Sequence, residues 1–414
     1  MENAIYKHNL HWDKPYSNLY KRKVVDKLLD RLHLRQIEVL QGIRRGGKTT
    51  VCKLVINELI KSIEPKSCLY INLDDPFFSE LYSDSKHLYR LLELSHKLTG
   101  VEVEYLFLDE VQNVQEWEKF VKAIYDNESV KKIFITGSNS SLLGGEYATL
   151  LSGRYLSTVI YPPEFSEVLG FYEIFNRLDI VRKKSFVLKL IDEMMHFGSF
   201  FEVLKEPNLK REIILNYYDT IIYKDCIANH NIRDSKSFKE ITNFIISNTS
   251  NLYSYNSIAK AIGTNENTVK KYIGFLQDSY LCTEVKHFSF SLKEQIKSKR
   301  KIYINDNSFL AQTSFRFSKD LGKLFENLVF SELLKRGFEI YFYNKDFECD
   351  FICKKDEKYF AFQVCYELNS LNRQRELNGL KKLPHKDIEK KIITYNQNEL
   401  LDDIEVVSFW DYFI

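Results

Sequence analysis

The stretch QIEVLQGIRRGGKTT, residues 36–50, decides the fold of this 414-residue chain. Its first part, residues 36–41, is apolar and rich in β-forming residues, which predicts a buried strand. Its second part, residues 42–49, matches the phosphate-loop pattern G-x-x-x-x-G-K-[ST] at every position. An amphipathic helical pattern over residues 50–62 follows. The stretch therefore predicts the strand, loop and helix of a phosphate-binding site.

We expect this loop to hold the phosphates of ATP together with Mg²⁺. Glycines allow the backbone to wrap so that successive N–H groups point at phosphate oxygens, and the helix that follows adds its positive end. Lys48 then reaches the β and γ phosphates, and the Thr49 hydroxyl ligates magnesium. The other residues that we expect to contact the nucleotide are Gly42, Arg44, Arg45, Gly46, Gly47 and Thr50.

A second apolar strand, residues 105–108, ends in two acidic residues, Asp109 and Glu110. At the end of a strand beside the phosphate loop, Asp109 would hold magnesium through its water shell, and Glu110 would polarise an attacking water. The alternative is a pair of solvated acids in a loop. The phosphate loop upstream favours the catalytic interpretation.

Two further polar features point to the same site. The strand at residues 131–136 runs into Ser138 and Asn139, and either side chain can sense the γ phosphate; the sequence does not choose between them. Arg154 enters the last strand, where it can stabilise charge in the transition state in its own subunit or across an interface. The plain alternative for Arg154 is a surface arginine.

Alternating strands and helices predict an α/β fold with an open, mostly parallel sheet covered on both faces. The five expected strands are residues 36–41, 67–73, 105–108, 131–136 and 156–161. We expect four domains: an ATPase core at 1–163, a helical lid or connector at 164–250, a winged helix-turn-helix at 251–305, and a small α/β domain at 306–414. The last contains a helix at 321–336 and strands at 339–343, 349–353 and 359–365.

Taken together, these motifs resemble the prokaryotic AAA-superfamily P-loop ATPases that carry a C-terminal winged helix and a restriction-endonuclease-like domain. The resemblance covers nearly the whole chain and extends to residues 348–351 and 362–365. It implies ATP binding and Mg²⁺-dependent hydrolysis, with Lys48, Thr49, Asp109 and Glu110 in the roles given above. It also implies that Arg154 acts as a finger or sensor.

The C-terminal domain departs from the nuclease pattern. An endonuclease-like site needs carboxylates that converge on magnesium and a lysine that orients the water. Glu326 and Asp350 supply acids, but Gln363, Val364 and Cys365 stand where the pattern has an acid, one residue and a lysine. Gln363 ligates weakly and Cys365 does not replace lysine. We therefore expect a degenerate site that is retained for binding or structure.

Charge leaves DNA binding open. With 59 Lys and Arg against 57 Asp and Glu, the chain has a net charge of +2 and is not a generally cationic nucleic-acid binder. A local DNA surface is still offered by the basic run from Lys293 to Lys301 and by the second helix of the winged-helix region, and the alternative is a packing module with a solvated hairpin. That helix carries Asn265, Asn267, Lys270 and Lys271.

No window reaches the ~18 apolar residues of a membrane-spanning helix, so we expect a soluble, cytoplasmic protein without membrane contact. The leading hypothesis is an ATPase whose nucleotide state rearranges the C-terminal modules. The alternatives are a slow nucleotide-dependent switch that recruits a protein partner or a copy of itself, and, ranked lower, an ATP-regulated nuclease.

Overall fold

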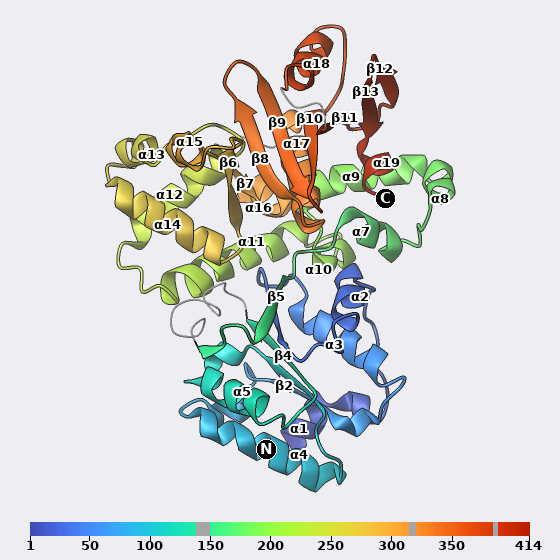
Figure 1. Cartoon of the computed structure of the whole chain (residues 1–414), viewed down its shortest axis with the longest axis vertical. Helices are drawn as coiled ribbons and strands as arrows, with labels where there is room; N and C mark the ends of the chain where they lie inside the picture. The colour runs from blue at the N-terminus through green and yellow to red at the C-terminus, as the bar shows by residue number, and fades with distance from the viewer. Residues whose placement is uncertain (138–149, 314–319, 384–387) are drawn as a thin grey trace. The chain divides into compact units, whose positions relative to one another are not determined.

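The computed structural model of this chain describes residues 1–137, 150–313, 320–383 and 388–414. They fall into two compact units, Met1–Tyr161 and Pro162–Ile414 (Figure 1). Among these described residues, no helix has the length and apolarity needed to cross a membrane.

A five-stranded parallel sheet forms the centre of the first unit. Its order is β2-β3-β4-β1-β5, so β4 lies between the strand that leads into the phosphate loop and the strand that ends in Asp109. Every strand predicted for this part of the chain is confirmed, with bounds that differ by one or two residues. The strands are β1 Ile37–Gln41, β2 Cys68–Asn72, β3 Tyr105–Asp109, β4 Lys132–Gly137 and β5 Tyr155–Val159.

Both faces of this sheet are covered by helices. Alternate side chains along each strand point to opposite faces and pack into different cores. On β1, Ile37 and Val39 belong to one core and Leu40 to the other. The first core is completed by α1 Glu2–His8, α4 Tyr89–Thr99 and α5 Trp117–Asp126. The second is completed by α2 Lys23–Leu29 and α3 Lys48–Leu59. Short 3₁₀ helices occur at Leu10–Trp12, Pro65–Ser67, Pro76–Leu81, Ser85–Leu88 and Val111–Asn113.

The second unit begins with a helical stretch, as the pattern over residues 164–250 predicts. Its helices are α7 Phe165–Phe171, α8 Arg177–Arg182, α9 Lys184–Phe197, α10 Phe201–Lys205, α11 Lys210–Thr220 and α12 Ser235–Ser247. A π-helical segment, η7 Ile221–Ala228, continues α11.

Two short helices and a hairpin come next. The helix α13 Tyr255–Ile262 ends at Gly263, whose φ of 80° a residue with a side chain rarely adopts. The helix α14 Glu266–Asp278 then starts after Asn265, whose side chain accepts from the Thr268 amide and caps the helix. The strands β6 Cys282–His287 and β7 Lys301–Ile304 pair antiparallel and flank α15 Leu292–Lys297.

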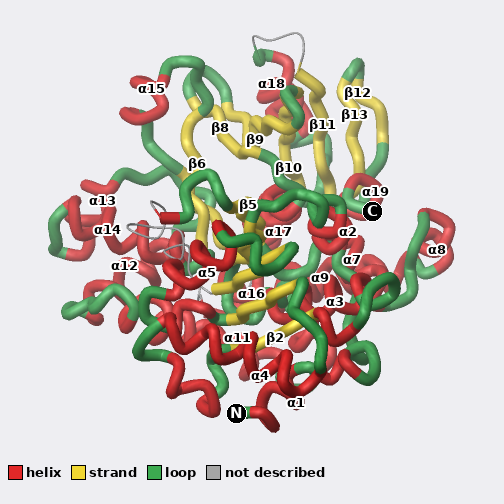
Figure 2. The backbone as a smooth tube through the Cα atoms, turned by 60° about the horizontal axis from the view of Figure 1, so that its bottom comes forward, coloured by secondary structure: helices red, strands yellow, loops and turns green. Residues whose placement is uncertain are grey.

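The C-terminal strands join that hairpin in one eight-stranded mixed sheet, of order β12-β13-β11-β10-β9-β8-β6-β7. Segments 251–305 and 306–414, which the sequence separates, therefore share a sheet through the pairing of β6 with β8. Figure 2 shows β8 to β11 side by side. The remaining elements are α16 Asn307–Thr313, α17 Leu321–Lys335, β8 Glu339–Asn344, β9 Glu348–Lys355, β10 Lys358–Cys365, α18 Arg373–Lys381, β11 Ile388–Thr394, β12 Glu399–Leu401, β13 Ile404–Ser408 and α19 Phe409–Tyr412.

Candidate functional site

The phosphate loop follows β1, whose five residues are all buried. Its glycines are required by the backbone path. A Cβ on Gly42 would lie 2.1 Å from the carbonyl oxygen of Ile160, and Gly47 has a φ of 101°. Arg45 also lies in the left-handed region, with a φ of 65°. This close approach and these backbone angles are what a loop of inward-facing N–H groups needs.

Lys48 is the first residue of α3 and is only 5% exposed. Its ammonium donates to the carbonyl oxygens of Gly42 at 2.9 Å and Ile43 at 3.3 Å, so it bends back over the start of the loop. The amino-terminal end of α3 adds the N–H groups of its first turn and the positive end of the helix dipole. The loop residues predicted to contact the nucleotide, including Arg44, Gly46 and Thr50, therefore lie together between the end of β1 and the first turn of α3.

Asp109 connects the acidic strand to the phosphate loop. One of its carboxylate oxygens accepts from the Thr49 hydroxyl at 2.6 Å and from the Tyr70 phenol at 2.7 Å. The other accepts from the Thr136 hydroxyl. The structure thus brings together Thr49 and Asp109, the two residues predicted to bind magnesium, and both offer the hard oxygen ligands that Mg²⁺ prefers.

Tyr70 was not found from the sequence, although it lies on the predicted strand β2. Burial and the neighbouring Asp109 carboxylate raise the pKa of its phenol, so the hydroxyl remains a donor at neutral pH. Because β2 is next to β3 in the sheet, the long side chain of Tyr70, in the middle of β2, reaches the carboxylate at the end of β3. The sequence signal that could have identified Tyr70 is a tyrosine on a buried strand that pairs with a strand ending in an acidic residue.

Glu110 occupies a strained backbone position, with a φ of 56°. Its amide donates to the Thr136 hydroxyl at 3.1 Å, and its carboxylate accepts from the Gln112 side chain at 2.6 Å. Non-glycine residues in the left-handed region are concentrated at functional sites. The Thr136 hydroxyl, near the end of β4, donates to the Asp109 carboxylate and accepts from the Glu110 amide, so it orients both acids. The predicted sensors Ser138 and Asn139 lie outside the described residues.

Arg154 is not brought to the phosphate loop of its own chain. The Ile37 amide donates to its carbonyl oxygen at 2.8 Å, which places it at the start of β1, whereas the loop follows the end of that strand. Four residues of strand separate the two ends by roughly 13 Å. The guanidinium instead pairs with Asp126 at 3.0 Å. Strand direction thus puts Arg154 at the opposite end of the strands from the phosphate loop of its own chain, and its action across an interface stays a prediction.

Arg22 contacts the loop and was missed by the sequence analysis. This residue is 5% exposed and donates to the carbonyl oxygens of Gly46 at 3.1 Å and Tyr161 at 2.7 Å. An ideal Cβ on Gly47 would lie 2.9 Å from the same guanidinium. Arg22 stands between two lysines, Lys21 and Lys23, and the sequence alone does not show which of the three is buried.

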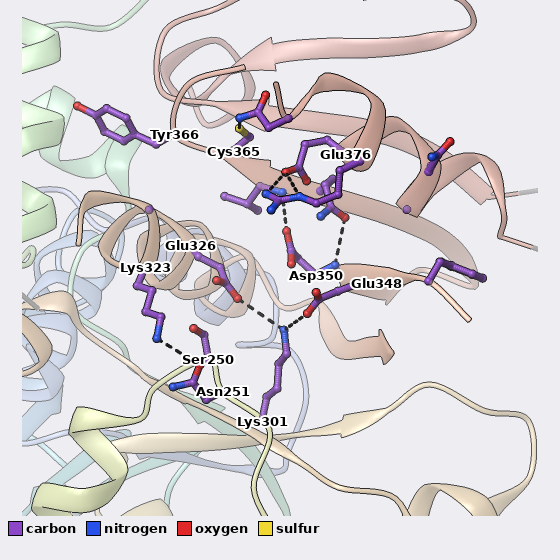
Figure 3. Close-up of a pocket in the computed structure, with 18 of the residues that line it drawn as sticks. Ser250, Asn251, Lys301, Lys323, Glu326, Glu348, Asp350, Cys365, Tyr366 and Glu376 are labelled. Carbon is purple, nitrogen blue, oxygen red and sulfur yellow. Dashed lines mark hydrogen bonds and ion pairs between the residues drawn. The ribbon is translucent and has the colours of Figure 1, made fainter. Parts of the chain in front are cut away.

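A second polar site lies within the second unit, in a pocket of about 980 Å³. Its walls come from β7, β9, β10, α17 and α18. Figure 3 shows the side chains of Glu326, Glu348 and Lys301 pointing toward one another, next to Asp350. The Lys301 ammonium lies 3.3 Å from a carboxylate oxygen of Glu348 and 4.0 Å from a carboxylate oxygen of Glu326.

The lysine of this charged cluster is Lys301, which belongs to β7 and not to the Gln363-Val364-Cys365 segment. Burial lowers the pKa of Lys301, but attraction from Glu326, Asp350 and Glu348 outweighs it, so the pKa is raised and the ammonium stays charged. Burial raises the pKa of both Glu326 and Asp350. In the part of the chain that the structure describes, no three His, Cys, Asp or Glu residues are grouped to hold a metal ion.

Gln363 lies beside Asp350, as predicted, and its side-chain oxygen accepts from the Asp350 amide at 3.4 Å. Cys365, which stands where the nuclease pattern has a lysine, carries no positive charge. Its thiol donates to the Glu367 carbonyl oxygen at 3.0 Å, and burial raises its pKa to about 11.

The basic run from Lys293 to Lys301 is not one exposed surface. Lys301 faces the pocket, and Arg300 pairs with Glu284 at 2.9 Å. Lys293, Lys297 and Lys299 are exposed. The sequence could not separate these roles, because the run does not show that β7 begins at its last residue, Lys301, and buries it.

Three known families match successive parts of the chain. An AAA domain matches residues 34–169, and two domains of unknown function, DUF8612 and DUF4143, match residues 188–320 and 321–412. The first match and the sheet around the loop identify the first unit as a P-loop AAA-type ATPase domain.

Two curated proteins match almost the full length. An uncharacterized protein of Methanocaldococcus jannaschii, MJ1544, is 36% identical over 94% of this chain and 91% of its own length. An uncharacterized protein of Haemophilus influenzae is 30% identical over 91% of this chain and 94% of its own length. Among solved structures, the Aeropyrum pernix ORC1 protein in complex with DNA is similar at 14% identity and a TM-score of 0.30, over 76% of this chain and 98% of that chain.

Proposed function

We propose that this chain, which belongs to the same family as the Methanocaldococcus jannaschii protein MJ1544 and has an AAA domain at residues 34–169, binds ATP with Mg²⁺ and hydrolyses it. The observation that carries the proposal is the 2.6 Å hydrogen bond between Thr49 and Asp109. It joins a phosphate loop to the acidic end of β3, so that a phosphate and a cation can be held side by side.

Each residue has a role that its position supports. Lys48 neutralises charge on the β and γ phosphates, while the glycine loop and the start of α3 donate N–H groups to them. Thr49 and Asp109 would hold Mg²⁺, which supplies positive charge at the phosphate oxygens when bound. Glu110 polarises the attacking water, and Thr136 holds Glu110 in place through its amide.

Two variants separate binding from turnover. Lys48→Ala should abolish ATP binding, because it removes the cation of the loop. Glu110→Gln should retain ATP and lower the hydrolysis rate by about 10² or more, because it removes the base. The matched controls are Lys61→Ala, an exposed residue just after α3, and Glu116→Gln, in the loop that follows Glu110. Normal hydrolysis in both site variants would contradict the proposal.

A second candidate function is a nucleotide-dependent switch that acts through the second unit. We propose a helical connector at 164–250, and a winged helix at 251–305 whose β6 joins the sheet of a nuclease-like domain at 306–414. DNA is favoured as the partner by α14, which exposes Lys270 and Lys271 opposite its buried Val269 and Ile273.

This second candidate is tested by ATPase assays with and without DNA at two salt concentrations, beside light scattering in each nucleotide state. Salt-sensitive stimulation by DNA supports the DNA partner. Self-association that depends on ATP supports recruitment of a second copy instead. Nicking of supercoiled plasmid in Mg²⁺ or Mn²⁺ would point to an ATP-regulated nuclease.

A further inference from the structure

The hairpin of β6 and β7 ends in a tip, residues 288–299, that presents large apolar side chains to solvent. Phe290 is 71% exposed, Leu292 is 67% exposed and Ile296 is 57% exposed. The helix of this tip is α15, and none of its residues is buried. Single exposed apolar side chains are ordinary on a protein surface, whereas a group of large ones marks a binding surface.

The tip is also cationic. Its one acid, Glu294, is paired with Lys345, and this lysine lowers the pKa of the Glu294 carboxyl, so the acid stays ionised and its charge is compensated. A partner that complements this surface is therefore anionic. The exposed lysines of the tip and of the adjoining end of β6 are Lys286, Lys293, Lys297 and Lys299.

The apolar and basic residues are separated on α15. Leu292 and Ile296 are four residues apart and share one face of the helix, and Lys293 and Lys297 share the next face. Figures 1 and 2 both show α15 at the outside of the second unit, beyond β6. An apolar face bordered by lysines is typical of a segment that lies in the headgroup region of an anionic bilayer.

Hydrogen bonds hold the tip in this form. The Ser291 side chain accepts from the Glu294 amide at 3.4 Å and caps α15, and the Gln295 side chain donates to the Ser289 carbonyl oxygen at 2.6 Å. At the start of the tip, Phe288 packs against the core of the C-terminal sheet. The exposed side chains are therefore offered by an ordered backbone, so that less conformational entropy is lost when a partner binds.

We propose that residues 288–299 bind the surface of an anionic membrane, with the lysines on the lipid headgroups and with Phe290, Leu292 and Ile296 in the outer part of the acyl layer. Lipid is favoured over DNA because contacts with DNA phosphates would use the lysines and leave the apolar side chains in water. It is favoured over a second copy because two cationic tips repel each other.

This proposal goes beyond ATP hydrolysis and does not depend on it. Contact with one side of a bilayer needs no membrane-spanning helix. It would therefore correct the expectation, drawn from the lack of such a helix in the sequence, that the chain has no membrane contact.

Co-sedimentation of the full-length chain with vesicles tests the proposal. The vesicles are phosphatidylcholine alone, or phosphatidylcholine with about 30% phosphatidylglycerol, which supplies the negative surface potential. Binding to the anionic vesicles should be at least about tenfold tighter than binding to the neutral ones, and salt should weaken it. Absence of binding, or equal binding to both, would overturn the proposal.

Two double variants separate charge from insertion. Lys293→Gln with Lys297→Gln should weaken binding to anionic vesicles about tenfold or more. Leu292→Ser with Ile296→Ser should weaken it at least as much, because the apolar area that enters the bilayer is lost. If only the lysine variant loses affinity, the tip binds polyanions without insertion and the membrane proposal fails.

Matched controls come from elsewhere in the second unit. Lys236→Gln with Lys358→Gln removes two exposed lysines, and Leu371→Ser with Leu400→Ser removes two leucines that are 93% and 71% exposed. Both controls should bind the anionic vesicles like the parent. Equal losses in a control and in the corresponding tip variant would show that the binding is not specific to the tip.

Phe290→Trp reports insertion directly. The natural tryptophans, Trp12, Trp117 and Trp410, are at most 8% exposed, so brominated lipids should quench only the new side chain. A blue shift and quenching on anionic vesicles are expected. An unchanged spectrum when the protein is bound to the vesicles would overturn the insertion of the tip.

The variant with Leu292→Ser and Ile296→Ser also tests the other partners. If its binding to a duplex oligonucleotide falls while its binding to vesicles does not, the tip is a wedge for DNA. If light scattering shows that the parent is a dimer and that this variant is a monomer, the tip is an interface between copies. In either case the membrane proposal fails, whether or not the first unit hydrolyses ATP.

Discussion

The guanidinium of Arg22 donates a hydrogen bond of 3.1 Å to the carbonyl oxygen of Gly46, inside the phosphate loop. Its second terminal nitrogen donates at 2.7 Å to Tyr161, the last residue of the first unit. The loop is therefore connected through one side chain to the point where the chain continues into the second unit. This connection fixes a loop that otherwise depends on glycines with high conformational freedom.

Replacement of Arg22 should loosen the loop and weaken ATP binding. Arg22→Met removes two charge-assisted hydrogen bonds, each worth about 1.5–3 kcal/mol, and part of this loss should appear as a roughly tenfold lower ATP affinity. Arg22→Lys keeps the charge but not the two-point donor geometry, so we expect an intermediate affinity. Titration with a fluorescent ATP analogue measures both, and the exposed Lys21→Met is the control. Unchanged affinity in Arg22→Met would show that the loop is held without this residue.

Tyr70 should tune the magnesium requirement. Its phenol shares a carboxylate oxygen of Asp109 with Thr49, so it fixes the direction in which the carboxylate faces the cation. Tyr70→Phe should raise the Mg²⁺ concentration needed for half-maximal ATP hydrolysis several-fold, with little change in ATP affinity at saturating Mg²⁺. Mg²⁺ titrations of hydrolysis rate provide the measurement. An equal loss at all Mg²⁺ concentrations would instead indicate general disruption of the sheet.

Arg154 can act on ATP only across an interface between two copies. If it does, Arg154→Ala should reduce a hydrolysis rate that rises with protein concentration, and mixing it with Glu110→Gln should restore part of the activity. If it does not, the variant should hydrolyse ATP like the parent and lose only the ion pair with Asp126, a surface contact worth about 1 kcal/mol or less. Rates measured over a range of protein concentrations separate the two outcomes.

The first unit was predictable because its signals are local. A phosphate loop, an acid-ended strand and alternating apolar runs each depend on neighbouring residues, and five short strands followed from them. What the sequence could not provide is the lateral strand order. That order places β5 next to β1, and brings Tyr70 and Thr136 to Asp109.

The second unit was less predictable because its site is assembled from distant strands. The sequence pattern directs attention to Gln363 and the two residues after it, whereas the lysine that lies beside Glu326 and Glu348 is Lys301, before α17. In sequence, Lys301 is one of several cations in a basic run, and only the pairing of β7 with β6 shows that it is buried. The strands β11 and β13, which pair parallel beside β10, were also not predicted.

His11 gives the first unit a dependence on pH. The ring is 1% exposed, and burial lowers its pKa to about 4, although the nearby Cys68 carbonyl oxygen opposes this shift. Its Nε2 lies 3.0 Å from that oxygen and its Nδ1 lies 2.9 Å from the Tyr16 hydroxyl. The folded state therefore keeps a neutral imidazole where the unfolded chain binds a proton near pH 6.5.

Since the unfolded state takes up this proton first, stability should fall as the pH drops from about 6.5 toward 4. For a single group with these two pKa values, the loss at pH 5 relative to pH 7.5 is about 2 kcal/mol. His11→Gln removes the titration, so its urea midpoint should change less between the two pH values, whatever its stability at pH 7.5. The control variant His87→Gln, at an exposed histidine, should show the same change in urea midpoint between the two pH values as the parent. An equal change in urea midpoint in the parent and in His11→Gln would show that another group controls the acid sensitivity of this unit.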